Sequence, residues 1–205
     1  MKPRKLLDTL IAADRLKDVT RHCYTAGGRR ESVAEHCWRA ALMAYFLKDE
    51  FPEADMDKVV TMCLIHDLGE AFTGDIPTFD KTKADEEKEE KLLYDWVKTL
   101  PEPYADEMLS LYEEMAALET VEAKIYKAID GLEAVLAHNE SNISTWIPYE
   151  YELNKTYAQD KVQFSSYLRE VRRLLREDTE QKIEEERMQE SQRKEPAEEN
   201  AEAPE

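Results

Sequence analysis

The stretch MDKVVTMCLIHDLGEAFT, residues 56–73, holds the most informative pattern in the chain. Its first ten residues are mostly apolar and predict a helix that is buried in a core. The titratable pair His66-Asp67 follows directly, and Glu70 comes one helical turn later. Because an isolated buried charge is costly, these side chains require partners inside the protein. A bound metal ion would explain all three.

Two further apolar helices are predicted to carry a residue of the same kind. His36 lies in SVAEHCWRAALMAY, residues 32–45, and Asp130 lies in KIYKAIDGLEAVLA, residues 124–137. Taken singly, such a residue is more often a satisfied core histidine or a solvent-facing acid than a ligand. Together with the His-Asp pair, the two residues place nitrogen and oxygen donors on three helices. This donor set suits a divalent metal ion of borderline or hard character.

The composition favours an all-α fold. Only 5 of the 205 residues are glycine, and Ala, Leu, Glu and Lys, which are good helix formers, are abundant. Residues 188–205 are polar and rich in Glu, Gln and Pro, which predicts a charged, disordered tail after a single domain, residues 1–187. We expect no strand pair and loops at residues 20–31, 75–82 and 145–154. The expected helices span residues 5–19, 32–51, 56–73, 83–100, 104–118, 120–139 and 158–187.

The charge and the cysteine count exclude several classes of function. The formal net charge is −18, which argues against nucleic-acid binding because that needs a basic surface. The three cysteines, an odd number with no CxxC pair, indicate a reducing compartment rather than a disulfide framework. No apolar run is long enough for a signal peptide or a membrane span. We therefore expect a cytoplasmic protein without a membrane partner.

The order of these residues, His36, then His66-Asp67, then Asp130, resembles the HD-domain superfamily of metal-dependent phosphohydrolases. The sequence that flanks these residues is similar to the 5′-deoxynucleotidase subgroup of this superfamily, and the resemblance covers about residues 5–175. It rests on ESVAEHCWRAALMA (31–44), CLIHDLGEAFTGDIP (63–77) and EAKIYKAIDGLEAVL (122–136). The resemblance implies an HD-domain helical bundle and a homodimer.

The resemblance also implies a ligand set for the metal. His36, His66, Asp67 and Asp130 match the family's metal ligands. Some members of the superfamily hold two metals and need extra histidines before the last aspartate, but residues 68–129 contain no histidine. We therefore expect one divalent ion per chain. Mixed His/Asp ligation leaves its identity open among Mn, Co, Fe, Ni, Mg and Zn.

The remaining active-site roles are implied in the same way. Glu70 and Asp75 match two further acidic positions, and we expect both to be catalytic, with Asp75 also able to contact the substrate. Arg21 matches an arginine that contacts the substrate phosphate. A bacterial deoxynucleotidase has a tryptophan next to that arginine, where this chain has His22. The choice between ribose and deoxyribose is therefore open, and His22 is expected to bind substrate.

The predicted function is hydrolysis of a nucleoside 5′-monophosphate, deoxynucleotides included, by metal-activated water. One alternative is an HD hydrolase of another phosphoester, such as a cyclic nucleotide, a nucleoside triphosphate or an alarmone, because pocket walls decide specificity. A second alternative is a non-catalytic module that binds metal or nucleotide for signalling. A third is an interaction protein whose acidic tail is the functional part. A complete ligand set together with Glu70 and Asp75 favours the enzyme.

Overall fold

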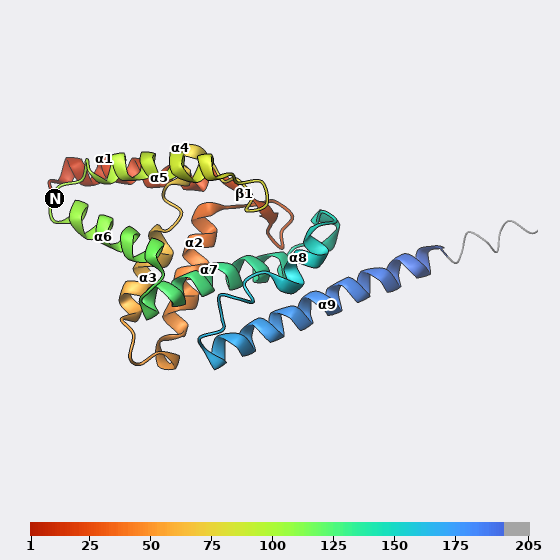
Figure 1. Ribbon diagram of the computed structural model, residues 1–205. Helices are drawn as coiled ribbons and strands as arrows, with labels where there is room; N and C mark the ends of the chain where they lie inside the picture. Colours follow the sequence, from red (N-terminus) through yellow and green to blue (C-terminus); the bar gives the residue numbers. More distant parts are fainter. Residues whose placement is uncertain (195–205) are drawn as a thin grey trace, which may run out of the picture.

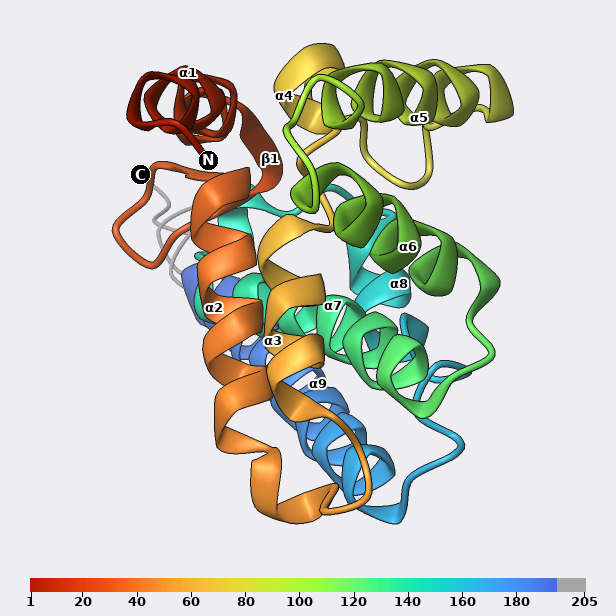
Figure 2. The same ribbon diagram turned by 90° about the vertical axis from the view of Figure 1, so that its left-hand side faces the viewer.

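Helix α7 (Val121–Glu140) runs through the middle of the molecule, and four other helices pack against it, namely α2, α3, α6 and α9. The computed structural model describes residues 1–194, which are mostly helical (Figure 1). Helices α2 (Val33–Phe46) and α3 (Met56–Ile65) lie side by side and cover one side of α7 (Figure 2). Helix α9 (Ser166–Lys194) packs on α7 as well. The prediction of an all-α bundle is confirmed.

The remaining elements surround this centre. In the view of Figure 2, α1 and η1 lie above the start of α2, and α4 and α5 lie together above α6. No helix within residues 1–194 combines the length and apolar character needed to cross a bilayer. The bounds are α1 Pro3–Asp14, η1 Arg15–Lys17, η2 Lys48–Glu50, α4 Glu70–Thr73, α5 Lys83–Val97, α6 Tyr104–Ala117, η3 Ile143–Thr145 and α8 Glu150–Thr156.

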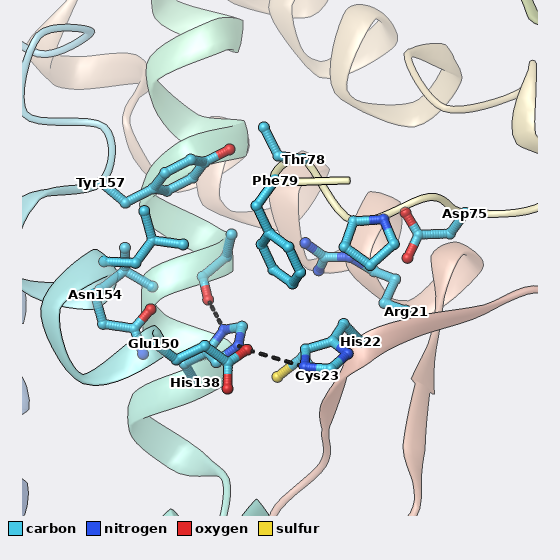
Figure 3. A pocket seen from close by; sticks show the side chains of 14 residues that line it. Arg21, His22, Cys23, Asp75, Thr78, Phe79, His138, Glu150, Asn154 and Tyr157 are labelled. Atoms are coloured by element: carbon cyan, nitrogen blue, oxygen red, sulfur yellow. Dashed lines mark hydrogen bonds and ion pairs between the residues drawn. The ribbon is translucent and has the colours of Figure 1, made fainter. Parts of the chain in front are cut away.

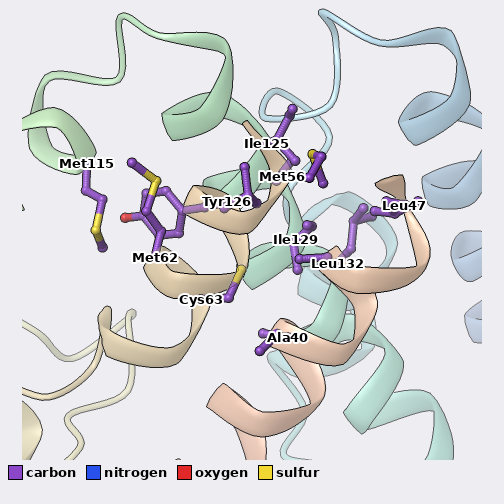
Figure 4. Close-up of a cluster of buried hydrophobic side chains, with 14 of the residues drawn as sticks. Ala40, Leu47, Met56, Met62, Cys63, Met115, Ile125, Tyr126, Ile129 and Leu132 are labelled. Carbon is purple, nitrogen blue, oxygen red and sulfur yellow. The ribbon is translucent and has the colours of Figure 1, made fainter. Parts of the chain in front are cut away.

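The main core lies where α2, α3 and α7 meet (Figure 4). Ile125, Ile129 and Leu132 of α7 are fully buried, and they recur at the spacing that keeps one helical face inward. Small residues on α2, such as Ala40, and Met62 on α3 complete the contact from the other side. Because this core joins the three helices directly, it fixes the relative positions of the residues that they carry.

Two helix starts follow the signals in the sequence. The Ser32 side chain accepts a hydrogen bond from the Glu35 backbone N–H, and the Glu35 carboxylate accepts one from the Ser32 backbone, which completes the predicted capping box. The Thr120 side chain accepts a hydrogen bond from the backbone N–H of Ala123 at the start of α7. Both helices therefore begin where local side-chain chemistry satisfies their first backbone donors.

The predicted helix over residues 56–73 is interrupted at residues 66–69. Helix α3 ends at Ile65, residues 66–69 form a turn, and α4 begins at Glu70. In the turn, the backbone hydrogen bonds join residues three positions apart instead of four. An example is the bond from the Leu68 N–H to the Ile65 carbonyl (3.1 Å). This tighter winding frees the Cys63 carbonyl, which accepts a hydrogen bond from His66 Nδ1. The break thus lies at the His-Asp pair itself.

The expected loop at residues 20–31 contains a short antiparallel hairpin instead. Strand β1 (Thr20–Tyr24) pairs with β2 (Arg30–Ser32), and Gly28 supplies the positive φ of the turn. The two glycines of the turn were visible in the sequence, but such short strands show little alternation. The hairpin places Arg21 beside α7, since β1 contacts that helix.

The C-terminal part also differs from the prediction. The expected loop at residues 145–154 contains most of α8, and the last helix begins at Ser166 rather than at residue 158. Turns fill the interval, with Ala158 in the left-handed region at φ 61°. Helix α9 continues to Lys194, past the start of the tail expected at residue 188. Residues 195–205 of that tail lie outside the described residues.

Replacing Gly131 with alanine is expected to destabilise the fold. A Cβ atom on this residue of α7 would lie 2.6 Å from the Ala158 Cβ, which cannot swing away because it is fixed to the backbone. Overpacking of this kind costs about 1–3 kcal/mol, against about 1 kcal/mol gained in helix propensity. Urea denaturation should therefore give a lower free energy of unfolding. Gly27→Ala is the matched control, since its nearest atom would be Thr25 Oγ1 at 3.7 Å. A variant Gly131→Ala as stable as the control would contradict the close packing.

Candidate metal centre

Three helices bring four donor side chains to one point beside the core. His36 comes from the first turn of α2, His66 from the C-terminal end of α3, Asp67 from the turn after it, and Asp130 from the middle of α7. The His36 side chain is almost fully buried, and the other three are largely enclosed. The structure therefore places together the four residues that the sequence singles out as metal ligands.

The distances between the donor atoms are those of a coordination shell. The Nε2 atoms of His36 and His66 are 3.2 Å apart, and Asp130 Oδ1 lies 3.3 Å from His36 Nε2 and 3.7 Å from His66 Nε2. Asp67 Oδ2 lies 3.1 Å from His66 Nε2 and 3.7 Å from His36 Nε2. Ligands held at about 2.0–2.2 Å from a shared ion lie about 3.0–3.6 Å from one another. His36, His66 and Asp67 each offer a donor atom within 4.8 Å of the others and could hold a metal ion, and Asp130 Oδ1 lies beside both histidines.

A hydrogen bond at Nδ1 fixes the orientation of each of the two imidazole rings. His66 Nδ1 donates to the Cys63 carbonyl at 2.9 Å, and His36 Nδ1 donates to the carboxylate of Glu133. Each ring therefore turns its Nε2 lone pair toward the other donors. Such second hydrogen bonds fix the tautomer and increase the basicity of a metal-binding histidine.

The charges of the four groups also favour a cation. Burial acts to lower the pKa of His66, but Asp67 and Asp130 raise it well above its ordinary value. Burial acts to raise the pKa of Asp67, but the neighbouring His66 holds it below its usual range. Positive charge is thus stabilised where the side chains converge. A divalent ion supplies that charge while the histidines bind it as neutral ligands, so its binding is coupled to proton release.

Glu133 is a site residue that the sequence reasoning missed. Its carboxylate is completely buried and accepts hydrogen bonds from His36, from Arg39 Nε at 2.7 Å and from Arg21 Nη1 at 3.2 Å. Burial opposes its ionisation, but these partners lower the pKa of Glu133 to about 2. The available signal was its place one turn after Asp130, between the apolar residues Leu132 and Ala134.

The variant Glu133→Gln is expected to weaken metal binding about 10–100-fold, the usual effect of losing a partner behind a metal-binding histidine. The amide keeps the size of the side chain but removes the negative charge that accepts the proton of His36 Nδ1. Titration with Mn²⁺ or Co²⁺ would measure the dissociation constant. Glu140→Gln is the control, because Glu140 also pairs with Arg39 but is half exposed and does not contact His36. Equal metal affinity in both variants would remove Glu133 from the metal centre.

Glu70 lies at the start of α4, just beyond the metal ligands. Its side chain is buried, and its Oε2 atom has no hydrogen-bond partner within the described residues. Burial raises the pKa of Glu70 to about 10, with further contributions from Asp67 and Asp75. A buried carboxyl group with a free oxygen beside a cluster of ligands is suited to moving a proton.

Arg21, His22 and Asp75 line one cavity next to the metal centre (Figure 3). Its volume is ≈ 100 Å³. Arg21 Nη1 bridges Glu31 (2.9 Å) and Glu133 (3.2 Å), so the same guanidinium contacts this cavity and the network behind His36. Burial raises the pKa of Asp75 against the opposing effect of Arg21. The structure therefore joins all the predicted site residues around one region.

The surroundings of His22 could not be foreseen from the sequence. Its Nε2 atom lies 3.4 Å from Glu150 Oε1, and its ring meets the edge of Phe79 at 5.7 Å between centroids. Glu150 also contacts His138 Nε2 at 2.8 Å, and both line the cavity. Glu150 belongs to α8, which lies in the segment expected to be a loop. The cavity wall opposite Arg21 thus comes from a helix that the sequence reasoning missed.

Comparison with known proteins gives a consistent result. A family profile described as HD domain matches residues 13–172. A human protein named 5′-deoxynucleotidase HDDC2 is 34% identical over 141 residues, which is 67% of this chain and 68% of the relative. A Dictyostelium discoideum protein of the same name is 29% identical over 150 residues, 69% of this chain and 74% of the relative.

A solved structure agrees with these matches. A predicted metal-dependent phosphohydrolase from Magnetospirillum magnetotacticum MS-1 superposes with a TM-score of 0.74 at 28% identity, over 87% of this chain and 93% of that one. The similarity in fold therefore extends over the helices that carry the four donor residues.

Proposed function

Because this chain belongs to the HD domain family, we propose that it hydrolyses nucleoside 5′-monophosphates, deoxynucleotides included, to nucleoside and phosphate. The predicted family and the predicted enzyme class, a phosphohydrolase, are confirmed by the comparisons. The observation that carries the proposed activity is the convergence of two imidazoles and two carboxylates beside a cavity that contains an arginine.

We propose that His36, His66, Asp67 and Asp130 hold one divalent ion, drawn from Mn, Co, Fe, Ni, Mg and Zn. When bound, the ion would lower the pKa of water and offset the negative charge of a phosphate group. The second oxygen of Asp130 accepts a hydrogen bond from Lys127 at 2.9 Å, which leaves Oδ1 directed at the histidines. This arrangement supports a single ion rather than a bridged pair.

Glu70 is proposed as the group that moves a proton during hydrolysis. Its free Oε2 can accept a proton from the attacking water and later release it to the leaving oxygen of the sugar. The raised pKa of about 10 reflects burial first and the nearby carboxylates of Asp67 and Asp75 second, and a nearby cation would lower it. The group is therefore placed to act as base and then as acid.

Arg21 is proposed to bind the phosphate of the substrate, since a guanidinium offers two parallel N–H donors to phosphate oxygens. Asp75, on the same cavity, would accept a hydrogen bond from a sugar hydroxyl or from water, and His22 would contact the sugar. At ≈ 100 Å³ the cavity is smaller than the 300–1,000 Å³ usual for whole ligands. It would therefore enclose only the part of the nucleotide next to the phosphate.

Phosphate release from a panel of ribo- and deoxynucleoside 5′-monophosphates, assayed with each of the six metals, would test this function. We expect turnover of monophosphates with at least one metal and none after chelation. Cyclic nucleotides, nucleoside triphosphates and alarmones belong in the same panel. Faster turnover of any of these would replace the proposed substrate class, and no turnover of any phosphoester would favour a binding module.

We also propose that residues 1–187 form the catalytic domain, that residues 188–205 form an acidic tail, and that the protein is cytoplasmic.

We propose in addition that the chain is a homodimer. An exposed apolar stripe along α2, made of Trp38, Leu42, Tyr45 and Phe46, supports a contact between copies. Light scattering should give twice the 23.9 kDa of one chain. Phe46→Glu should halve that mass, and the exposed Leu174→Glu on α9 should not. A monomeric wild type would end this proposal.

A further inference from the structure

A second cavity lies between the end of α8, the turns that follow it and the first turns of α9. Its volume is ≈ 310 Å³. Five of its eight lining residues are cationic, the other three are two glutamines and a valine, and none is acidic. This lining differs from the acidic average of a chain with a formal charge of −18, although Lys155 pairs with Glu152 outside the lining. The cationic residues are Lys155, Arg169, Arg172, Arg173 and Arg176.

Arg172 sets this cavity apart from an ordinary basic surface. The residue is only 4% exposed, yet no carboxylate pairs with it among the described residues. Its Nε and Nη2 atoms donate to the carbonyls of Tyr157 (2.7 Å) and Asn154 (2.9 Å), while Nη1 is buried without a hydrogen-bond partner. Burial and the nearby Arg176 lower the pKa of Arg172. A buried guanidinium without a counter-ion is costly, and an anion would relieve that cost.

The other cations can reach an anion at little cost. Arg173 pairs with Glu170 and Glu177, and Arg176 pairs with Glu180, but these side chains are about half exposed. Exposed ion pairs of this kind contribute little to stability and exchange partners readily. Within residues 1–194, Arg169 pairs with no carboxylate and donates instead to the Gln163 carbonyl at 2.6 Å. The rim of the cavity therefore offers several guanidinium groups around the buried one.

We propose that this cavity is a second anion-binding site that takes a small soluble molecule bearing a phosphate group. Phosphate matches it in charge and geometry, because planar guanidinium groups bind phosphate oxygens in pairs. The volume holds inorganic phosphate together with a small organic group. The inference does not depend on the proposed function, since none of its residues belongs to the metal centre or to the cavity of Arg21 and Asp75.

The proposed anion site and the cavity beside the candidate metal centre share a wall. Asn154 and Tyr157, whose carbonyls accept from Arg172, also line the cavity that contains Arg21 and Asp75. One short segment therefore separates the two cavities and forms a wall of each. An anion bound by Arg172 would change how its guanidinium group contacts these two carbonyls, either by pulling it away from them or by holding it against them.

Equilibrium dialysis of the metal-loaded full-length protein against radiolabelled inorganic phosphate, with ionic strength held constant by chloride, would test the site. The wild type should bind one more phosphate per chain than the double variant Arg169→Gln/Arg176→Gln. Each lost guanidinium contact should weaken binding about tenfold or more. This variant alters only rim residues, so the fold does not depend on it as it would on the buried Arg172. Equal stoichiometry and affinity in both proteins would overturn the proposal.

Arg187→Gln provides the matched control, because Arg187 is an exposed arginine on the same helix that does not line the cavity. If this control lost the same phosphate, binding would reflect overall charge and the site would be refuted. Vesicles containing phosphatidic acid form a parallel arm. If vesicles, but not free phosphate, bound in a manner that requires Arg169 and Arg176, the ligand would be a lipid headgroup and the small-molecule assignment would be wrong.

Discussion

Replacing Asp67 with alanine is expected to abolish metal binding and to reduce phosphate release by at least about 10³-fold. A bound ion contributes several kcal/mol to such a reaction, and each 1.4 kcal/mol is a factor of ten. Asp67 Oδ2 lies within 3.7 Å of both histidine Nε2 atoms, so its loss removes one of the two carboxylates that face the histidines. Metal content by mass spectrometry and phosphate release would be measured on the same sample.

The variant Asp95→Ala is the control for this substitution. Asp95 is an exposed aspartate on α5 whose only described ion pair is with Lys91. It should retain both metal and activity. If Asp67→Ala kept its metal while activity was lost, Asp67 would act in the reaction and not as a ligand. If it kept both, the assignment of the metal centre to these four residues would be wrong.

The variant Glu70→Gln is expected to retain its metal and to lose about 10²–10⁴-fold in kcat, the usual contribution of a positioned acid or base. Glutamine has the same shape but cannot accept or release a proton at this position. Because Glu70 is not one of the four donors, the metal affinity should change much less than in Asp67→Ala. Single-turnover phosphate release and metal titration separate the two effects.

Glu107→Gln on α6, an exposed position, controls for the loss of one negative charge. It should leave both kcat and metal affinity unchanged. A Glu70→Gln variant with near wild-type kcat would exclude Glu70 from proton transfer. A variant that loses its metal would instead make Glu70 part of the coordination shell. The pair of measurements therefore decides between a catalytic, a coordinating and a structural role.

These variants probe a site whose parts were unequally visible in the sequence. The capping box of α2, the capping threonine of α7 and the apolar spacing of Ile125, Ile129 and Leu132 predicted the helices that carry the donors. These signals are local, because they depend on side chains within one or two turns of each other. The resemblance to the HD-domain superfamily then named the four donor residues together.

The outer part of the site was hidden because it depends on contacts between distant segments. Glu133 is separated from His36 by 97 positions and from Arg21 by 112, and no local pattern records that the three meet. Glu150 meets His22 only because α8 forms where a loop was expected. Likewise, the turn at residues 66–69 breaks a helix that helical spacing alone would continue.

The sequence by itself determined the all-α class, the positions of most helices and the four candidate donors for a metal ion. These properties follow from side-chain chemistry and from hydrogen bonds over a few residues. Only the tertiary structure decided which carboxylate orients His36, how Arg21 is held, and that the buried Arg172, which pairs with no carboxylate of the described residues, lies behind the wall of the candidate cavity. The reason is physical: burial and pairing of charges depend on packing between helices far apart in the chain, which no local pattern encodes.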